Sequence, residues 1–140
     1  MKKVLLDTNV VLDFALKREP FYENAQTILN EIANGNVQGY ITASMATDIF
    51  YMLQKTNGKV FALDIFADLV IILDVLSVYR EDVYSALHSG WTDFEDALQA
   101  QIAVRSGMDA IVTRNSKDYI KIQSIKIILP LDFIQYLESS

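Results

Sequence analysis

The side chains in this sequence that could do chemistry are acids that follow apolar runs or open the next segment. Asp7 comes directly after three apolar residues, Val4, Leu5 and Leu6. Later acids occupy comparable positions: Asp48, Asp93, Asp96 and Asp118. Crowded carboxylates repel one another, and hard divalent cations such as Mg²⁺ or Mn²⁺ prefer oxygen ligands of this kind. Such a site can activate water and stabilise an in-line phosphoryl displacement.

The elements that would position these acids alternate along the chain. Short, branched apolar segments predict strands at residues 4–6, 39–42, 70–76, 109–113 and 125–129. Helical spacing of apolar residues predicts helices at residues 10–16, 21–33, 43–53, 59–69, 79–87, 93–105 and 131–137. Alternating strands and helices with short connections are typical of a parallel sheet covered on both faces. We therefore expect residues 1–140 to form one α/β domain, a three-layer α/β/α sandwich with a mainly parallel sheet.

Ligands of open parallel sheets bind at the carboxyl ends of the strands, and the sequence places the acids there. Each acid also has a simpler interpretation. An aspartate that opens a helix, such as Asp48 or Asp93, is often a cap, and Asp118 lies in a polar turn. Thr8 and Asn9 are good caps for the first helix. Only the whole set of acids, taken together, therefore indicates a site.

Composition excludes several classes of function. The chain has 140 residues, a net charge of −6, one histidine and no cysteine. A thiolate zinc site and a multi-histidine site are thus excluded, and a broad basic surface for nucleic acid is disfavoured. A nuclease that gathers its acids around cations remains compatible with this charge. The apolar run at residues 69–78 contains Asp74 and is too short to span a bilayer, so we expect a cytoplasmic protein with no membrane segment.

Four segments of the chain together resemble the PIN-domain ribonucleases. They are residues 4–10 (VLLDTNV), the segment around Asp48, residues 93–99 (DFEDALQ) and residues 111–119 (IVTRNSKDY). The resemblance covers nearly the full chain, whose length is similar to that of stand-alone PIN proteins such as the VapC-type toxins. It implies an endonuclease that cleaves RNA phosphodiesters with Mg²⁺ or Mn²⁺. It also implies a homodimer and, for a toxin, a small antitoxin partner that fills the acidic groove.

The resemblance implies roles for individual residues. Asp7 matches the first metal-binding aspartate and Asp96 the third acid, with Asp93 as an auxiliary ligand or one that acts through water. Asp48 stands where the family often has glutamate. Asn115 stands where many members have aspartate, and Asp118 is expected to replace the missing charge. The implied catalytic residues are Asp7, Asp48 and Asp96, and the implied metal ligands are Asp7, Asp48, Asp93, Asp96, Asn115 and Asp118.

Two other functions are compatible with the sequence. An aspartyl-phosphate phosphotransferase also has an aspartate after its first strand, but position 9 is asparagine where a haloacid-dehalogenase-like phosphatase has a second aspartate. A non-catalytic PIN-like module that binds RNA or a protein is favoured by the departures at Asp48 and Asn115.

Several basic and aromatic residues have weaker claims to a role. The basic residues beside the first and last motifs could hold phosphates, although solvated surface charge is the simpler interpretation for Lys17, Arg18, Arg114, Lys117 and Lys121. Trp91 could stack on a base, whereas core packing is favoured for Tyr119. His88 is expected at a helix end rather than as a base.

Overall fold

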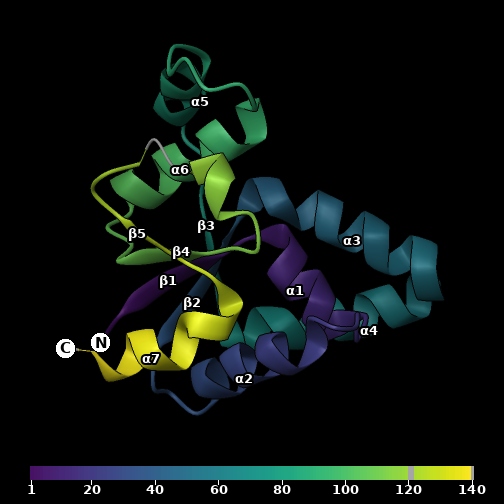
Figure 1. The fold of residues 1–140 in the computed structure, drawn as a ribbon. Helices are drawn as coiled ribbons and strands as arrows, with labels where there is room; N and C mark the ends of the chain where they lie inside the picture. The colour runs from purple at the N-terminus through teal and green to yellow at the C-terminus, as the bar shows by residue number, and fades with distance from the viewer. Residues whose placement is uncertain (120–121, 140) are drawn as a thin grey trace.

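A five-stranded parallel sheet forms the centre of the molecule (Figure 1). The computed structural model describes residues 1–119 and 122–139. The strands are β1 (Lys3–Leu6), β2 (Gln38–Thr42), β3 (Leu73–Leu76), β4 (Ala110–Val112) and β5 (Lys126–Ile128). Their order is β3-β2-β1-β4-β5, and every neighbouring pair is parallel. β1 lies in the middle, so Val4, Leu5 and Leu6 are buried on both faces of the sheet.

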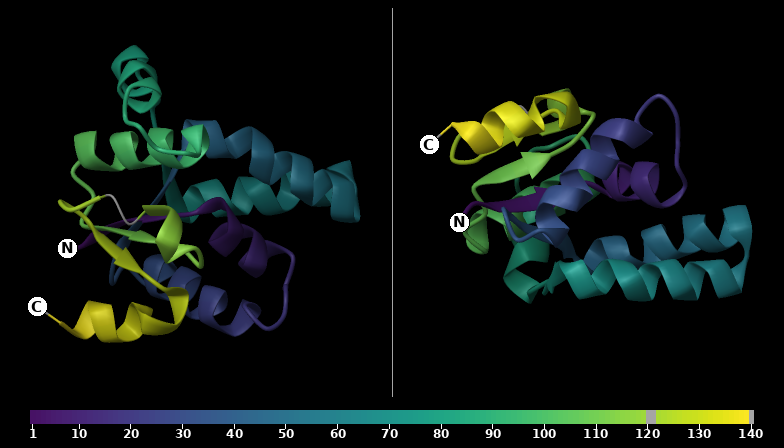
Figure 2. Two further views of the ribbon diagram at one scale, coloured as in Figure 1. Left: turned by 45° about the horizontal axis from the view of Figure 1, so that its top comes forward. Right: turned by 90° about the horizontal axis from the view of Figure 1, so that it is seen from below.

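Helices cover both faces of this sheet. They are α1 (Thr8–Ala15), α2 (Tyr22–Ala33), α3 (Ala43–Asn57), α4 (Lys59–Ile72), α5 (Arg80–Leu87), α6 (Phe94–Arg105) and α7 (Phe133–Glu138), with short 3₁₀ turns η1 (Ser116–Tyr119) and η2 (Pro130–Asp132). Figures 1 and 2 show α2 and α7 on one side of the sheet, α5 and α6 on the other, and α3 and α4 as an antiparallel hairpin. The predicted single-domain three-layer sandwich with a parallel sheet is confirmed.

The strand order places β1 at a topological switch point. The chain moves from β1 to β2 to β3 in one direction and then crosses back to β4 on the other side of β1. Right-handed crossovers in opposite directions put their helices on opposite faces and leave a crevice at the carboxyl ends of the two strands where the order reverses. Asp7 follows β1 and Thr113 follows β4, and the Asp7 N–H donates to the Val112 carbonyl at 3.0 Å. These two residues therefore stand side by side at that crevice.

The predicted strand at residues 70–76 is wrong in its first half, and its apolar composition, which favours a buried strand, misleads about its exposure. Residues 70–72 are the end of α4, and only Leu73–Leu76 form a strand. Because β3 is an edge strand, Asp74 and Val75 are exposed. A continuous apolar run does not distinguish a helix from a strand, and here the run crosses from one to the other without a turn residue.

Helix boundaries otherwise follow the sequence signals closely. Gly58, with φ 90°, separates α3 from α4, between the helices predicted at residues 43–53 and 59–69. His88 lies at the C-cap of α5, as expected. The predicted final helix at residues 131–137 divides into η2 and α7. Within the part of the chain that the structure describes, no helix is both long and apolar enough to cross a bilayer.

Candidate active site

Asp7 is fixed at the carboxyl end of β1 by one hydrogen bond to each carboxylate oxygen. The Thr113 hydroxyl donates to Oδ2 at 2.8 Å, and the Thr8 N–H donates to Oδ1 at 2.9 Å. Asp7 itself is thus the N-cap of α1, and the prediction of Thr8 or Asn9 as the cap is wrong. Burial, which leaves 9% of Asp7 exposed, raises its pKa, and the two hydrogen bonds act against that rise. The result is a buried carboxylate with a single orientation.

The first turn of α6 brings two more acids to the same place. Asp93 is the N-cap of this helix, and its Oδ1 accepts the Asp96 N–H at 2.9 Å. Burial and, in decreasing order, the charges of Asp93, Asp118 and Asp7 together raise the pKa of Asp96 to about 6. Acids from three separate segments therefore lie near enough to Asp96 to raise its pKa.

Asp48 lies beside Glu95, which belongs to the same helix turn as Asp93 and Asp96. Glu95 was not among the site residues predicted from the sequence. Asp48 is exposed on the second turn of α3. Partial desolvation by its neighbours raises the pKa of the otherwise exposed Glu95, and the carboxylates of Asp48 and Asp93 raise it further. Glu95 lies in the same first turn as Asp93 and Asp96, and that proximity was the available signal. Asp48 and Glu95 thus form a further pair of acids beside the group around Asp7 and Asp96.

The loop after β4 supports the site through its backbone hydrogen bonds rather than through the side chain of Asn115. The Asn115 N–H donates to the Thr113 hydroxyl oxygen at 3.0 Å, and the Asp118 N–H donates to the Asn115 carbonyl at 3.0 Å. Thr113 therefore accepts from the loop while it donates to Asp7. The Asn115 side chain is exposed and has no hydrogen bond to an acid in the described residues, so its role as a ligand stays a prediction.

Tyr119 places a buried hydroxyl beside the acids. Its side chain is fully buried, as predicted, and its ring packs edge-on against Trp91 with centroids 6.0 Å apart. The hydroxyl has no well-formed hydrogen bond within the described structure, although Asp96 lies close by. Burial and the charges of Asp7 and Asp96 raise the pKa of Tyr119, so the hydroxyl keeps its proton and can only donate to a carboxylate.

The donor set suits a hard divalent cation. The acids around Asp7 offer only oxygen ligands, and in the described residues no lysine or arginine forms a salt bridge with them. As they stand, no three of the described acids are close enough together to hold an ion. Asp48, Glu95 and Asp118 are exposed and can change rotamer, whereas Asp7 is fixed. Binding would therefore draw exposed carboxylates towards Asp7.

The raised pKa of Asp96 predicts how stability varies with pH. Because the folded protein holds this proton more tightly than the unfolded chain, the metal-free protein should lose stability as pH rises from about 4 to 6. We expect a loss on the order of 1 kcal/mol, given partial screening by solvent. Urea unfolding across this range measures it. Asp96→Asn should flatten the dependence, and an identical slope in that variant would contradict the assignment.

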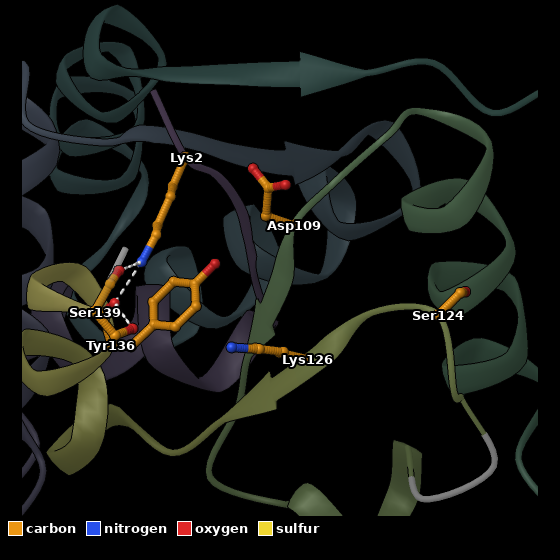
Figure 3. Close-up of a pocket in the computed structure, with 6 residues that line it drawn as sticks. All are labelled: Lys2, Asp109, Ser124, Lys126, Tyr136 and Ser139. Atoms are coloured by element: carbon orange, nitrogen blue, oxygen red, sulfur yellow. Dashed lines mark hydrogen bonds between the residues drawn. The ribbon is translucent and has the colours of Figure 1, made fainter.

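A cavity lies at the amino-terminal ends of the strands, at the opposite end of the sheet from Asp7. It measures about 300 Å³ and is lined by Lys2, Asp109, Ser124, Lys126, Tyr136 and Ser139 (Figure 3). The Lys2 ammonium donates to the carbonyls of Tyr136 and Ser139 and lies 4.1 Å from the centre of the Tyr136 ring. A cation at these last carbonyls caps α7 and joins it to β1, so we assign the cavity a structural role.

Comparison with known proteins places this geometry in a family. A model of the PIN domain matches residues 3–117. The structure is similar to VapBC-1 from nontypeable Haemophilus influenzae (TM-score 0.70, 14% identity, 92% of this chain and 98% of that chain covered). It is similar to DNA-bound VapBC from Salmonella typhimurium (TM-score 0.69, 20% identity, 93% and 99% covered).

A further structural relative is Mycobacterium tuberculosis VapC20, described as a toxin that cleaves the sarcin-ricin loop (TM-score 0.67, 12% identity, 87% and 98% covered). No curated protein sequence matches the chain significantly. At these low sequence identities the solved structures are evidence for the fold alone. The family model matches most of the sequence and is therefore evidence for the family. The chain belongs to the PIN-domain family.

Proposed function

We propose that this protein is a metal-dependent endoribonuclease that cleaves RNA phosphodiesters. The observation that carries the proposal is the buried Asp7 carboxylate, oriented by Thr113 and Thr8 at the switch point of the sheet. Acids from α6 and from the loop after β4 lie near this carboxylate. Asp7, Asp93 and Asp118 all raise the pKa of Asp96. A structural role alone does not account for this many carboxylates without a salt bridge in the described part of the chain, because their mutual repulsion destabilises the fold.

Asp7, Asp96 and Asp118 would hold Mg²⁺ or Mn²⁺, with Asp93, Asp48, Glu95 and Asn115 as further or water-mediated ligands. A divalent cation there supplies Lewis-acid chemistry, which neutralises phosphate charge and makes water a stronger nucleophile. Thr113 keeps the Asp7 carboxylate in one orientation through the 2.8 Å hydrogen bond to Oδ2. The Tyr119 hydroxyl faces Asp96 as a protonated donor and so favours its ionised form.

We further propose that the protein is the toxin of a toxin-antitoxin pair, a cytoplasmic homodimer inhibited by a small antitoxin. The support is the likeness to VapBC structures and to a VapC described as a toxin that cleaves the sarcin-ricin loop. Exposed apolar side chains on α4 and α5, among them Leu63, Ile71 and Leu87, offer surface for such contacts.

The direct test is cleavage of labelled RNA by the purified protein. We expect cleavage with Mg²⁺ or Mn²⁺, at specific phosphodiesters, and none in the presence of a chelator. Co-purification with the product of a neighbouring reading frame should suppress the activity. A preparation that cleaves equally well with the chelator would contradict the proposal, because the acids would then have no role in the chemistry.

A non-catalytic PIN-like module is the competing function. It is favoured by one observation, that no three of the described acids already form a closed metal site. Calorimetric titration with Mn²⁺ separates the two functions. The nuclease should bind Mn²⁺ with an affinity that rises with pH through about 6, because Asp96 must lose its proton. Absence of binding at neutral pH would favour the module.

A further inference from the structure

Two arginines from distant parts of the chain share one buried aspartate beside the active site. Asp13 on α1 is 1% exposed. Arg114 donates to it from Nε at 2.8 Å and from Nη2 at 3.2 Å, and the Arg18 Nε lies 3.0 Å from its Oδ1. One carboxylate between two guanidinium groups leaves one positive charge in excess. The side chains of Arg18 and Arg114 are 32% and 24% exposed, so that charge is accessible from solvent.

Both guanidinium groups are held in place before any ligand arrives. Arg18 follows Lys17, whose φ of 51° turns the chain, and the Arg18 N–H donates to the Asp13 carbonyl at 3.0 Å. Its Nη2 also donates to the Asn9 Oδ1 at 3.2 Å. Arg114 lies 3.8 Å from the centre of the Phe21 ring. Arginine forks fixed in this way lose little side-chain entropy on binding a phosphate.

An apolar cavity adjoins the second of these arginines. It measures about 260 Å³ and is lined by Phe21, Asn24, Arg114, Leu129, Pro130 and Leu131. Figure 1 shows the segment after β5 beside α2, which brings the two walls of this cavity together. Apolar walls with one amide and one guanidinium group suit a nucleobase, which stacks on planar groups and hydrogen-bonds at its edge.

This arrangement lies next to the proposed catalytic acids. Arg114 directly follows Thr113, which binds Asp7, and Asn9, which binds Arg18, is two residues after Asp7. The charge of Arg114 acts to lower the pKa of Asp7, against the larger effect of burial. In a molecule with a net charge of −6, a local excess of positive charge here can offset the repulsion between the acids and an RNA backbone.

We propose that Arg18 and Arg114 bind an RNA phosphate next to the scissile one, and that the adjoining cavity holds the base attached to it. This subsite deepens the proposed function and rests on it. It gives the protein a preference for a nucleotide beside the cut, set by the walls of the cavity rather than by the acids.

The test is binding of fluorescein-labelled oligoadenylate and oligouridylate with Ca²⁺ in place of Mg²⁺, measured by fluorescence anisotropy. Arg114→Gln and Arg18→Gln should each raise the Kd roughly tenfold. Each should also lower the slope of log Kd against log salt concentration by about one. Either variant leaves Asp13 paired with the other arginine, so both should fold. Arg80→Gln, with the same charge change on the exposed surface of α5, is the control and should bind like the wild type.

A second variant examines the base pocket. Leu131 is 68% exposed, and Leu131→Trp should fill the cavity without strain. Wild-type protein should bind one of the two oligonucleotides more tightly, and Leu131→Trp should remove that difference. Arg114→Lys should recover only part of the lost affinity, because a lysine cannot present a fixed fork.

The outcomes separate this proposal from the one it rests on. RNA binding that responds to Arg114→Gln, without cleavage in Mn²⁺, would support the subsite and contradict the nuclease. Equal effects of Arg114→Gln and Arg80→Gln would overturn the subsite even if the wild type cleaves RNA. If Arg114→Gln lost binding to an acidic peptide but kept its RNA affinity, these arginines would belong to a site for a protein partner. That result would also overturn the proposed subsite.

Discussion

Replacing Asp7 with asparagine is expected to lower metal-dependent RNA cleavage by roughly a thousandfold, which corresponds to several kcal/mol of lost transition-state stabilisation. Asparagine has nearly the same shape: its Oδ1 can still accept the Thr8 N–H, and its amide nitrogen can donate to the Thr113 hydroxyl oxygen where Asp7 accepted from it. It lacks the charge that a divalent cation needs. Single-turnover cleavage of a labelled RNA measures the loss.

The fold should survive the Asp7→Asn change. Burial raises the pKa of Asp7, so the charged form is unfavourable in the metal-free protein, and a neutral side chain removes that cost. Asp64→Asn, on the exposed surface of α4, makes the same charge change away from the site and should retain activity. If Asp7→Asn cleaved RNA as fast as Asp64→Asn does, Asp7 would have no part in the chemistry.

The second large effect is expected at Asp13. This carboxylate is almost fully buried between Arg18 and Arg114, which lie at 3.0 and 2.8 Å. Asp13→Asn leaves the two guanidinium groups without a counter-ion, and removal of one partner of a buried pair costs about 3–5 kcal/mol. Because both arginines are partly exposed, we expect the lower end of this range. Urea unfolding monitored by circular dichroism gives the change in the free energy of unfolding.

The control for Asp13 is Asp68→Asn, an exposed aspartate on α4, which should change stability by less than about 0.5 kcal/mol. The double variant Asp13→Asn with Arg114→Gln should recover part of the loss, since it removes one of the two uncompensated charges. A loss at Asp13 no larger than at Asp68 would mean that the two ion pairs are solvated and contribute little.

Local patterns were sufficient for most of the fold. Each strand and helix is marked by its own apolar spacing and by residues such as Gly58, and these signals act within a few residues of the chain. The boundary between α4 and β3 was predicted wrongly because the apolar run at residues 70–73 crosses it without a turn residue. The α/β class and the position of Asp7 after the first strand followed from the sequence in the same local way.

The site was predictable in part, from the position of each acid relative to a strand end. The sequence indicated Asp7, Asp93, Asp96 and Asp118, and the structure brings the other three near enough to Asp96 to raise its pKa. It did not indicate Glu95, which pairs with Asp48, or the buried Tyr119 hydroxyl beside Asp96. Lys121, considered as a phosphate ligand, lies outside the described residues.

The sequence by itself thus determined the alternating elements and an aspartate at the end of the first strand. Only the tertiary structure decided which groups share a contact. Thr113 reaches Asp7 across 106 residues, and Arg114 reaches Asp13 across 101. Such pairs depend on β4 lying beside β1 and on the crossover that returns the chain to it, whereas periodicity reports only which face of its own element a residue occupies.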